Sequence, residues 1–322
     1  MNQRLGKRLR QILLYKEISA VAAIIVICAV LSFFSSFFFT FPIWNTILTY
    51  ASPIGFVAAG MTVLMVSGEF DLSVGSVFAL TAVAAFHWAS LGMNVWVATA
   101  LSLGIACLAG LLNGVVVVKV GVNSFITTLG TGYLFLTLAL VVSNGYTEIP
   151  PTDRLFQFVM GNGSIFGITD NILWLVAIVI LCQLLLSKTT HGNWSLAVGG
   201  NRASAAAMGV NVARVKIMNF ILCSFLAGLS GLINLTHINS AAGLSGTGLE
   251  LETIAAVVVG GTALYGGSGT VIGSLLGALL LGTIFIGVNI AGVTSYWFEG
   301  VSGTVLVVTA ILNQKIYKLR SR

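Results

Sequence analysis

The sequence predicts an all-α polytopic membrane protein with about ten transmembrane helices and with both termini in the cytoplasm. Two features of its composition predict this class: 57% of the 322 residues are hydrophobic and only 7% are charged, against about 25% charged residues in an ordinary soluble domain. A third feature is the length of charge-free stretches such as residues 72–118, which exceeds the roughly 20 residues that one spanning helix needs. A soluble globular enzyme is therefore excluded.

The apolar stretches define the expected spans in chain order. Because hydrocarbon offers the backbone no hydrogen-bonding partner, each stretch is expected to be helical and to end at polar, Gly-rich or Pro-rich positions. The ten expected spans are 18–39, 43–66, 72–91, 95–118, 123–142, 171–187, 217–236, 252–265, 270–290 and 296–313. The eighth is short: about 14 residues rise only about 21 Å, so this span either extends back into the 240s or does not fully cross the membrane.

The basic residues indicate the direction of threading. With residues 1–17 as a basic cytoplasmic leader, 18–313 as one transmembrane domain and 314–322 as a basic tail, only Arg154 of the 15 Lys and Arg residues falls outside. An even number of spans follows, and eight remains open if two segments are re-entrant. Residues 143–170 then form an outer loop, which is either a plain connector or a surface for a soluble partner. Residues 188–216 form an inner segment with a small-residue helix between glycines.

Several kinds of chemistry are absent from the sequence. It contains no G-x-x-x-x-G-K-[ST] phosphate loop, so any ATP hydrolysis belongs to another chain. The four cysteines and three histidines have no spacing that indicates a disulfide, a metal site or a catalytic pair, and the bases are not interleaved with aromatics as in a nucleic-acid surface. The carboxylates fall near expected interfaces, and Asp71 is expected to be solvated or to cap a helix.

Polar and small residues on the spans allow two interpretations, a solute pathway or contacts between helices. Asn123, Thr127 and Thr128 are candidates for a translocation pathway, where they would hydrogen-bond a neutral hydroxylated solute, or they bond neighbouring helices. The glycines that repeat every four residues from Gly269 to Gly277 are expected to let helices approach closely.

Three motifs make a family recognisable. They are SGEFDLSVGS at residues 67–76, GGN at 199–201 followed by GVNVARVK at 209–216, and GTGLELETIAAVVVGGT at 246–262 followed by GGSGT at 266–270. Over about residues 45–312 the chain resembles the ribose-type permease subunits of bacterial ABC importers. The motif positions singled out by this resemblance are Asp71, Ser73, Gly75, Glu250, Gly260 and Gly261.

The resemblance implies a multi-pass permease domain of the bacterial inner membrane, surrounded by membrane lipid, that carries a simple sugar or related polyol. It implies as partners a second permease copy, a cytoplasmic ABC ATPase that uses ATP and Mg, and a periplasmic sugar-binding protein, with no cofactor bound by this chain and no nucleic acid. The segment that couples to the ATPase would include Gly199, Gly200, Asn201, Ala205, Ala206, Gly209 and Arg214.

Two departures from the family pattern bear on the solute. Glu69 stands where the family usually has glycine, and IGVN at residues 286–289 replaces the commoner NGLN, which leaves open a solute other than ribose. The sequence leaves two other functional classes open: an ion-coupled secondary carrier of a small polar solute, and a membrane scaffold without transport. The lack of carboxylates at expected mid-membrane positions argues against the carrier.

Overall fold

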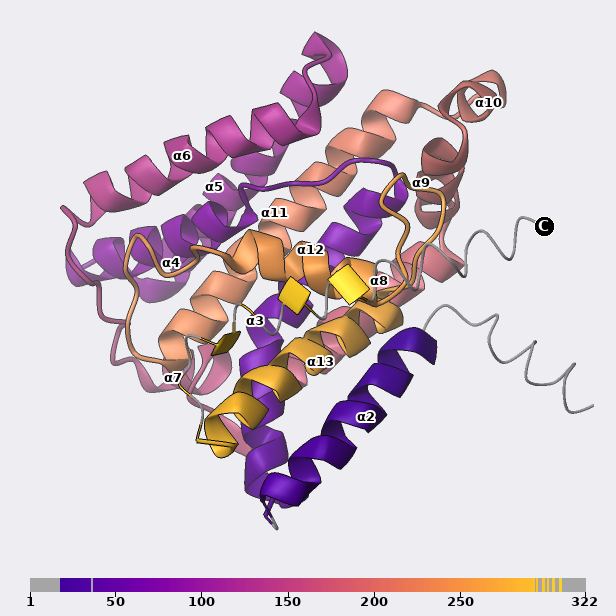
Figure 1. Ribbon diagram of the computed structural model, residues 1–322. Coiled ribbons are helices and arrows are strands. Elements are labelled where there is room, and N and C mark those ends of the chain that lie inside the picture. Colours follow the sequence, from indigo (N-terminus) through magenta and orange to yellow (C-terminus); the bar gives the residue numbers. More distant parts are fainter. Residues whose placement is uncertain are drawn as a thin grey trace, which may run out of the picture.

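The structure is a computed structural model that describes residues 18–35, 37–292 and isolated positions between 294 and 308. The expected leader 1–17, the expected tail 314–322 and most of the expected span 296–313 lie outside the described residues. Within the described part, helices and two very short strands follow one another in a single bundle (Figure 1).

The helices at the N-terminal half are mostly long and apolar. They are α2 (Ile18–Phe34), α3 (Phe41–Val66), α4 (Val74–Ser90), α5 (Val95–Val115) with the π-helical turn η1 (Val116–Val120), α6 (Ser124–Val142) and the short α7 (Arg154–Met160). A two-residue antiparallel hairpin follows, formed by β1 (Ser164–Ile165) and β2 (Ile168–Thr169).

The second half contains two short helices between longer ones. Its elements are α8 (Asp170–Lys188), α9 (Thr190–Gly200), α10 (Arg202–Ala207), α11 (Val212–His237), α12 (Leu249–Val259) and α13 (Val271–Ile290). In Figure 1, α7 and α10 lie at opposite ends of the bundle, which are called here the α7 end and the α10 end.

Six helices of the described chain are long and apolar enough to cross a membrane, so the all-α membrane class is confirmed while the number ten stays a prediction. The helix in the eighth expected span, 252–265, has 11 residues, Leu249–Val259: it begins three residues before the expected span and ends six residues before the expected end. The physical reason lies in the glycines at its borders, because Gly248 and Gly261 both take φ near +90° and interrupt the helical backbone. At 1.5 Å per residue this helix covers about 16 Å, roughly half of a hydrocarbon core.

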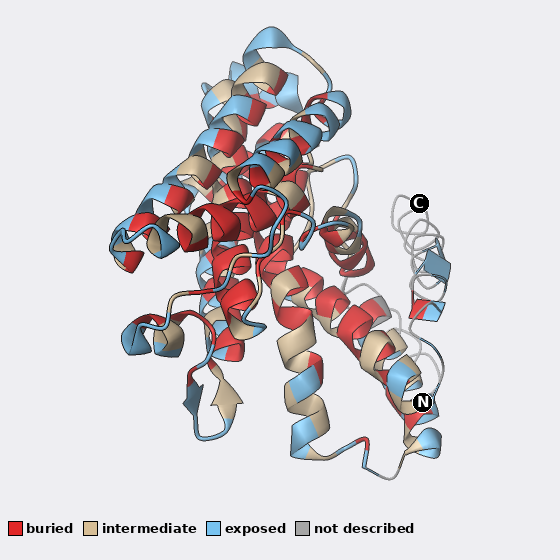
Figure 2. Cartoon of the chain, turned by 90° about the vertical axis from the view of Figure 1, so that its left-hand side faces the viewer, coloured by how far each residue is buried: buried red, intermediate tan, exposed pale blue. Residues whose placement is uncertain are grey.

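The centre of the bundle consists of α3 and α11. Within their most apolar windows 78% of α3 and 72% of α11 is buried, whereas the corresponding value for α6 is 28%. α11 packs against α3, α4 and α5, and α13 packs against α3 and α12. Figure 2 shows the buried residues gathered in the middle of the bundle, with exposed residues along the outer helices and at both ends. Apolar outer faces of this kind suit lipid or a second membrane chain.

Candidate functional site

The segment at the α10 end forms a compact pair of helices. Asn201 caps α10 through its side-chain oxygen, which accepts a hydrogen bond from the Ser204 backbone N–H at 3.0 Å. Ala205 is buried against the neighbouring Val198 and Val215, whereas Ala206 is exposed. Gly209 ends the segment with φ +84° and has open space around it. The expected short helix between glycines is therefore present, and it presents an exposed outer surface.

Gly199 joins this segment to the bundle. A Cβ atom at Gly199 would lie 1.9 Å from the Val66 carbonyl oxygen and 2.6 Å from the Gly267 nitrogen, so only glycine fits between these backbones. The Gly267 N–H also donates to the Val66 carbonyl oxygen at 2.9 Å. The end of α9, the end of α3 and the loop 260–270 thus meet through main-chain atoms. Backbone atoms make this contact directly.

An ion pair lies beside that junction. The Lys216 ammonium contacts the Glu69 carboxylate at 2.6 Å, and only 10% and 16% of the two side chains are exposed. The pair connects the first turns of α11 to the loop that follows α3. It also accounts for the charged residue at position 69, which departs from the pattern of the resembled family.

Asp71 is buried, which corrects the expectation of a solvated position or of a helix cap. Its carboxylate accepts hydrogen bonds from the Ser73 N–H at 2.8 Å, the Ser73 hydroxyl at 2.6 Å and the Ser224 hydroxyl at 3.3 Å. The Asn113 amide donates to both carboxylate oxygens at 3.2–3.3 Å. The loop 67–73 folds inward against α5 and α11, so donors from three elements replace water around the carboxylate.

The starts of α4 and α12 meet in the interior of the bundle. A Cβ atom at Gly75 would lie 2.3 Å from the Gly246 carbonyl oxygen and 2.4 Å from a carboxylate oxygen of Glu250. At the other end of α12, a Cβ atom at Gly260 would lie 2.3 Å from the Gly273 carbonyl oxygen, and one at Gly277 would lie 2.0 Å from the Ala256 carbonyl oxygen. The glycines of the motifs therefore permit close backbone packing.

The remaining candidates lie on α6. The Asn123 side chain accepts from the Phe125 N–H at 2.8 Å, and the Thr128 hydroxyl accepts from the Leu72 N–H at 2.9 Å. The Thr127 hydroxyl is buried and has no hydrogen-bond partner among the described residues. None of the three lines either cavity described below, so their role in a pathway stays a prediction.

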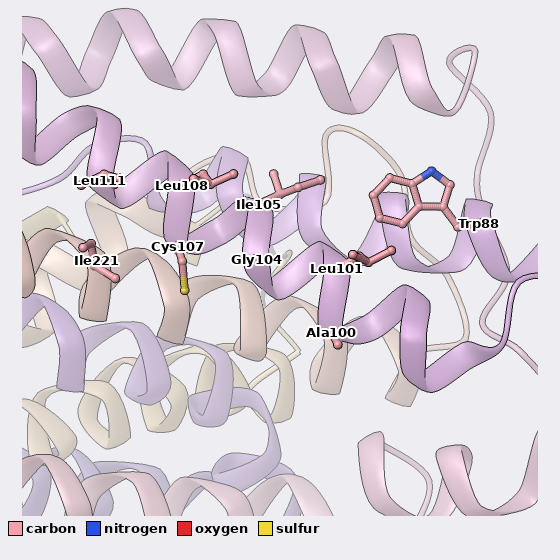
Figure 3. A pocket seen from close by; sticks show the side chains of 9 residues that line it. All are labelled: Trp88, Ala100, Leu101, Gly104, Ile105, Cys107, Leu108, Leu111 and Ile221. Carbon is pink, nitrogen blue, oxygen red and sulfur yellow. The ribbon is translucent and has the colours of Figure 1, made fainter.

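An apolar groove of about 610 Å³ runs along the outer face of α5. Figure 3 shows its lining side chains, most of them from α5, with Trp88 from α4 and Ile221 from α11. The full lining is Trp88, Ala100, Leu101, Gly104, Ile105, Cys107, Leu108, Leu111 and Ile221. This lining offers almost no hydrogen-bonding groups, so the groove suits hydrocarbon rather than a hydrophilic solute.

A second cavity, of about 690 Å³, lies toward the α7 end and is far more polar. It is bounded by the first half of α3, the start of α8, the end of α11, residues 245–252 and α13. Its polar lining residues are Asn45, Thr46, Thr49, Tyr50, Thr169, Asn171, Asn234, His237, Ser245, Thr247 and Glu252. Sequence reasoning missed this site because its residues come from separate parts of the chain, 45–54, 169–171, 234–252 and 285–286, with Phe78. The only available signal was an amide on an otherwise apolar span, as at Asn171 and Asn234.

The chain matches known transport proteins over most of its length. Residues 43–310 match the family described as "Branched-chain amino acid transport system / permease component". The chain is 36% identical to the ribose import permease protein RbsC of Escherichia coli (strain K12) over 303 residues, which are 93% of this chain and 94% of that protein. It is 36% identical to the xylose/arabinose import permease protein XylH of Sulfolobus acidocaldarius, over 92% of this chain and 85% of XylH. Identity to the L-arabinose transport system permease protein AraH of Escherichia coli (strain K12) is 34%, over 96% and 92% of the two chains.

Proposed function

The chain belongs to the branched-chain amino acid transport system / permease component family, and on this premise we propose that it is the permease subunit of an ABC importer for a simple sugar. The observation that carries the proposal is its similarity along nearly the whole chain to permeases named for ribose, xylose and arabinose. It is accordingly a multi-pass protein of the bacterial inner membrane.

The proposal includes a topology and a set of partners. Ten spans with both termini in the cytoplasm would bring nearly all Lys and Arg residues to the inner face. This agrees with the general excess of Lys and Arg in the cytoplasmic loops of membrane proteins. The α10 end is then cytoplasmic and the α7 end periplasmic. The partners are a second permease copy, an ABC ATPase that hydrolyses ATP with Mg, and a periplasmic sugar-binding protein. This chain carries out no covalent chemistry.

The segment 188–216 is proposed to couple ATP hydrolysis to transport. The exposed surface of α10 supports a docking role, and the contact of Gly199 with Val66 and Gly267 supports a mechanical connection to the bundle. Closing of the ATPases would displace α9 and, through these main-chain contacts, the helices around the pathway. Thr127 and Thr128, with Asn123, remain candidates for the part of the pathway that faces the second permease copy.

Transport by the reconstituted complex tests the function. Proteoliposomes that contain the permease, its ATPase and the binding protein are expected to accumulate a radiolabelled pentose only when ATP is supplied. Dissipating proton and sodium gradients is expected to leave accumulation unchanged. Uptake that survives ATPase inactivation but stops without an ion gradient would show a secondary carrier instead, and no uptake with any simple sugar would contradict the proposal.

A charge on the exposed face of α10 is expected to uncouple the complex. The change Ala206→Glu places a carboxylate at a proposed protein interface without altering the buried side of the helix. We expect ATP-driven uptake to fall about tenfold or more, since one unpaired charge in an interface costs several kcal/mol. Insertion and thermal stability of the permease alone should be unchanged. Ala206→Gln, which adds a side chain of the same size without the charge, is the matched control, and an equal uptake for Ala206→Glu and the parent would exclude Ala206 from coupling.

A further inference from the structure

We propose that the polar cavity toward the α7 end is a binding site for a neutral polyhydroxy solute, in which the side-chain oxygen of Asn171 accepts a hydrogen bond from a solute hydroxyl. The inference rests on the proposed function and deepens it, because it assigns a site and its residues within one permease chain. Asn171 and Asn234 lie outside all three sequence motifs, although the third motif contributes Thr247, Leu249 and Glu252 to the lining.

Asn171 provides the first observation. Its side chain lines the cavity although the residue is only 1% exposed. Its amide nitrogen donates to the Asn234 side-chain oxygen at 3.2 Å, and its own side-chain oxygen has no hydrogen-bond partner among the described residues. Buried acceptors of this kind are rare in folded proteins and are usually satisfied by another group or by an ordered molecule. The free oxygen of Asn171 therefore requires a donor, and the adjoining cavity is the place from which a donor can come.

The orientation of this amide follows from its neighbours. The Asn234 amide nitrogen donates to the Ser230 carbonyl oxygen at 2.9 Å, and a carbonyl oxygen can only accept. The Asn234 oxygen consequently faces Ser52, whose hydroxyl donates to it at 2.8 Å, and also faces Asn171. Asn171 must therefore direct its NH₂ group toward Asn234, which leaves its oxygen as the unused group. A chain of buried partners thus fixes an acceptor at the cavity wall.

Other groups of the lining suit a sugar. The His237 Nδ1 atom lies 2.6 Å from the Gly161 carbonyl oxygen, which can only accept, so Nδ1 carries a proton; when the ring is neutral, Nε2 is a second acceptor. Tyr50 and Phe285 stack with their ring centroids 3.9 Å apart and form an apolar aromatic wall. Sugars have C–H faces between their hydroxyl groups, so a site with acceptors on one side and aromatic carbon on another matches their surface.

The charge of the lining favours a neutral solute. No Lys or Arg is among the residues that line the cavity, so an anionic solute would lack a counter-ion there. Glu252 lines it as well, and its carboxylate would repel an anion and can accept hydrogen bonds from hydroxyl groups. The volume of about 690 Å³ falls within the range of about 300–1,000 Å³ that is typical of small-molecule sites. Among uncharged solutes, those rich in hydroxyl groups match these acceptors best.

Protection of an introduced thiol tests the site in the full transporter. In proteoliposomes with the ATPase and binding protein, Thr49→Cys places a thiol in the cavity lining, to be labelled with a membrane-impermeant methanethiosulfonate. The parent protein with its native cysteines provides the background rate. Saturating ribose, xylose or arabinose is expected to slow labelling at least threefold, while leucine or glutamate gives no protection. Absence of protection by every pentose, or equal protection by glutamate or leucine, would overturn the inference.

The change Asn171→Ala in the Thr49→Cys protein tests the acceptor. We expect the pentose concentration that gives half-maximal protection to rise about tenfold, because one hydrogen bond to a buried acceptor is lost. Asn162→Ala is the matched control: Asn162 is exposed just after α7, at the same end of the bundle, and is not among the lining residues. An unchanged half-maximal concentration in Asn171→Ala would remove Asn171 from the site. If ATP-driven pentose uptake persists without protection, only the cavity assignment is wrong. If no simple sugar is taken up, the proposed function is wrong.

Discussion

Replacing Gly199 by leucine is expected to abolish ATP-driven uptake and to lower the free energy of unfolding by about 3 kcal/mol or more. The reason is steric, since a Cβ atom at this position would lie 1.9 Å from the Val66 carbonyl oxygen and 2.6 Å from the Gly267 nitrogen. Main-chain atoms cannot rotate away as the tip of a side chain can, so α9 must separate from α3 and from the loop 260–270. Uptake in proteoliposomes and thermal unfolding in detergent measure the two effects.

The neighbouring glycine provides the control for this prediction. A Cβ atom at Gly200 would have its nearest neighbour, the Gly267 Cα atom, at 3.9 Å, which is ordinary van der Waals contact. Gly200→Ala is therefore expected to retain uptake within about twofold and to leave stability nearly unchanged. If Gly199→Leu retained uptake and stability as well as Gly200→Ala does, the close backbone contact between α9 and the end of α3 would not matter for either property.

Replacing Asp71 by alanine is expected to destabilise the bundle by about 3–5 kcal/mol. The change removes the acceptor for Ser73, Asn113 and Ser224 at once and leaves buried donors that water does not reach. Chemical unfolding of the purified permease in detergent and its yield in the membrane measure the loss.

Asp153→Ala is the matched control for this carboxylate. Asp153 accepts a hydrogen bond from the Phe156 N–H at 2.8 Å and caps the short α7 helix near the surface. Its loss is expected to cost only about 0.5–2 kcal/mol, as for other helix caps. A cost for Asp71→Ala no larger than for Asp153→Ala would mean that the buried hydrogen bonds of Asp71 contribute little.

The long helices were predictable from the sequence because hydrocarbon imposes one strong requirement, an uninterrupted apolar stretch with internal hydrogen bonds. The expected spans 43–66 and 217–236 correspond closely to Phe41–Val66 and Val212–His237. The end of the eighth span was not predictable, because hydropathy does not register a left-handed glycine such as Gly261 inside the apolar stretch 252–265. The short α10 helix was expected because a stretch of small residues lies between glycines there.

The surroundings of Asp71 and of the polar cavity depend on contacts between residues far apart in the chain. Asp71 was expected at an interface because it follows a long span, and only the packing of Asn113 and Ser224 around it makes a buried position tolerable. In the same way, Asn171 and Asn234 are separated by 63 residues and meet only through the fold. A single sequence carries no period or spacing that relates such residues. Their association had to come from the structure.

The half-length helix α12 has a mechanical consequence. One of its ends adjoins the loop whose Gly267 rests on α9, and the other begins beside the contact of Gly246 with Gly75 inside the bundle. Glycines with φ near +90° stand at both borders, so the helical backbone stops there. α12 is thus a helix of about 16 Å between two backbone contacts, and in the proposed mechanism a displacement of α9 would reach the start of α4 through it.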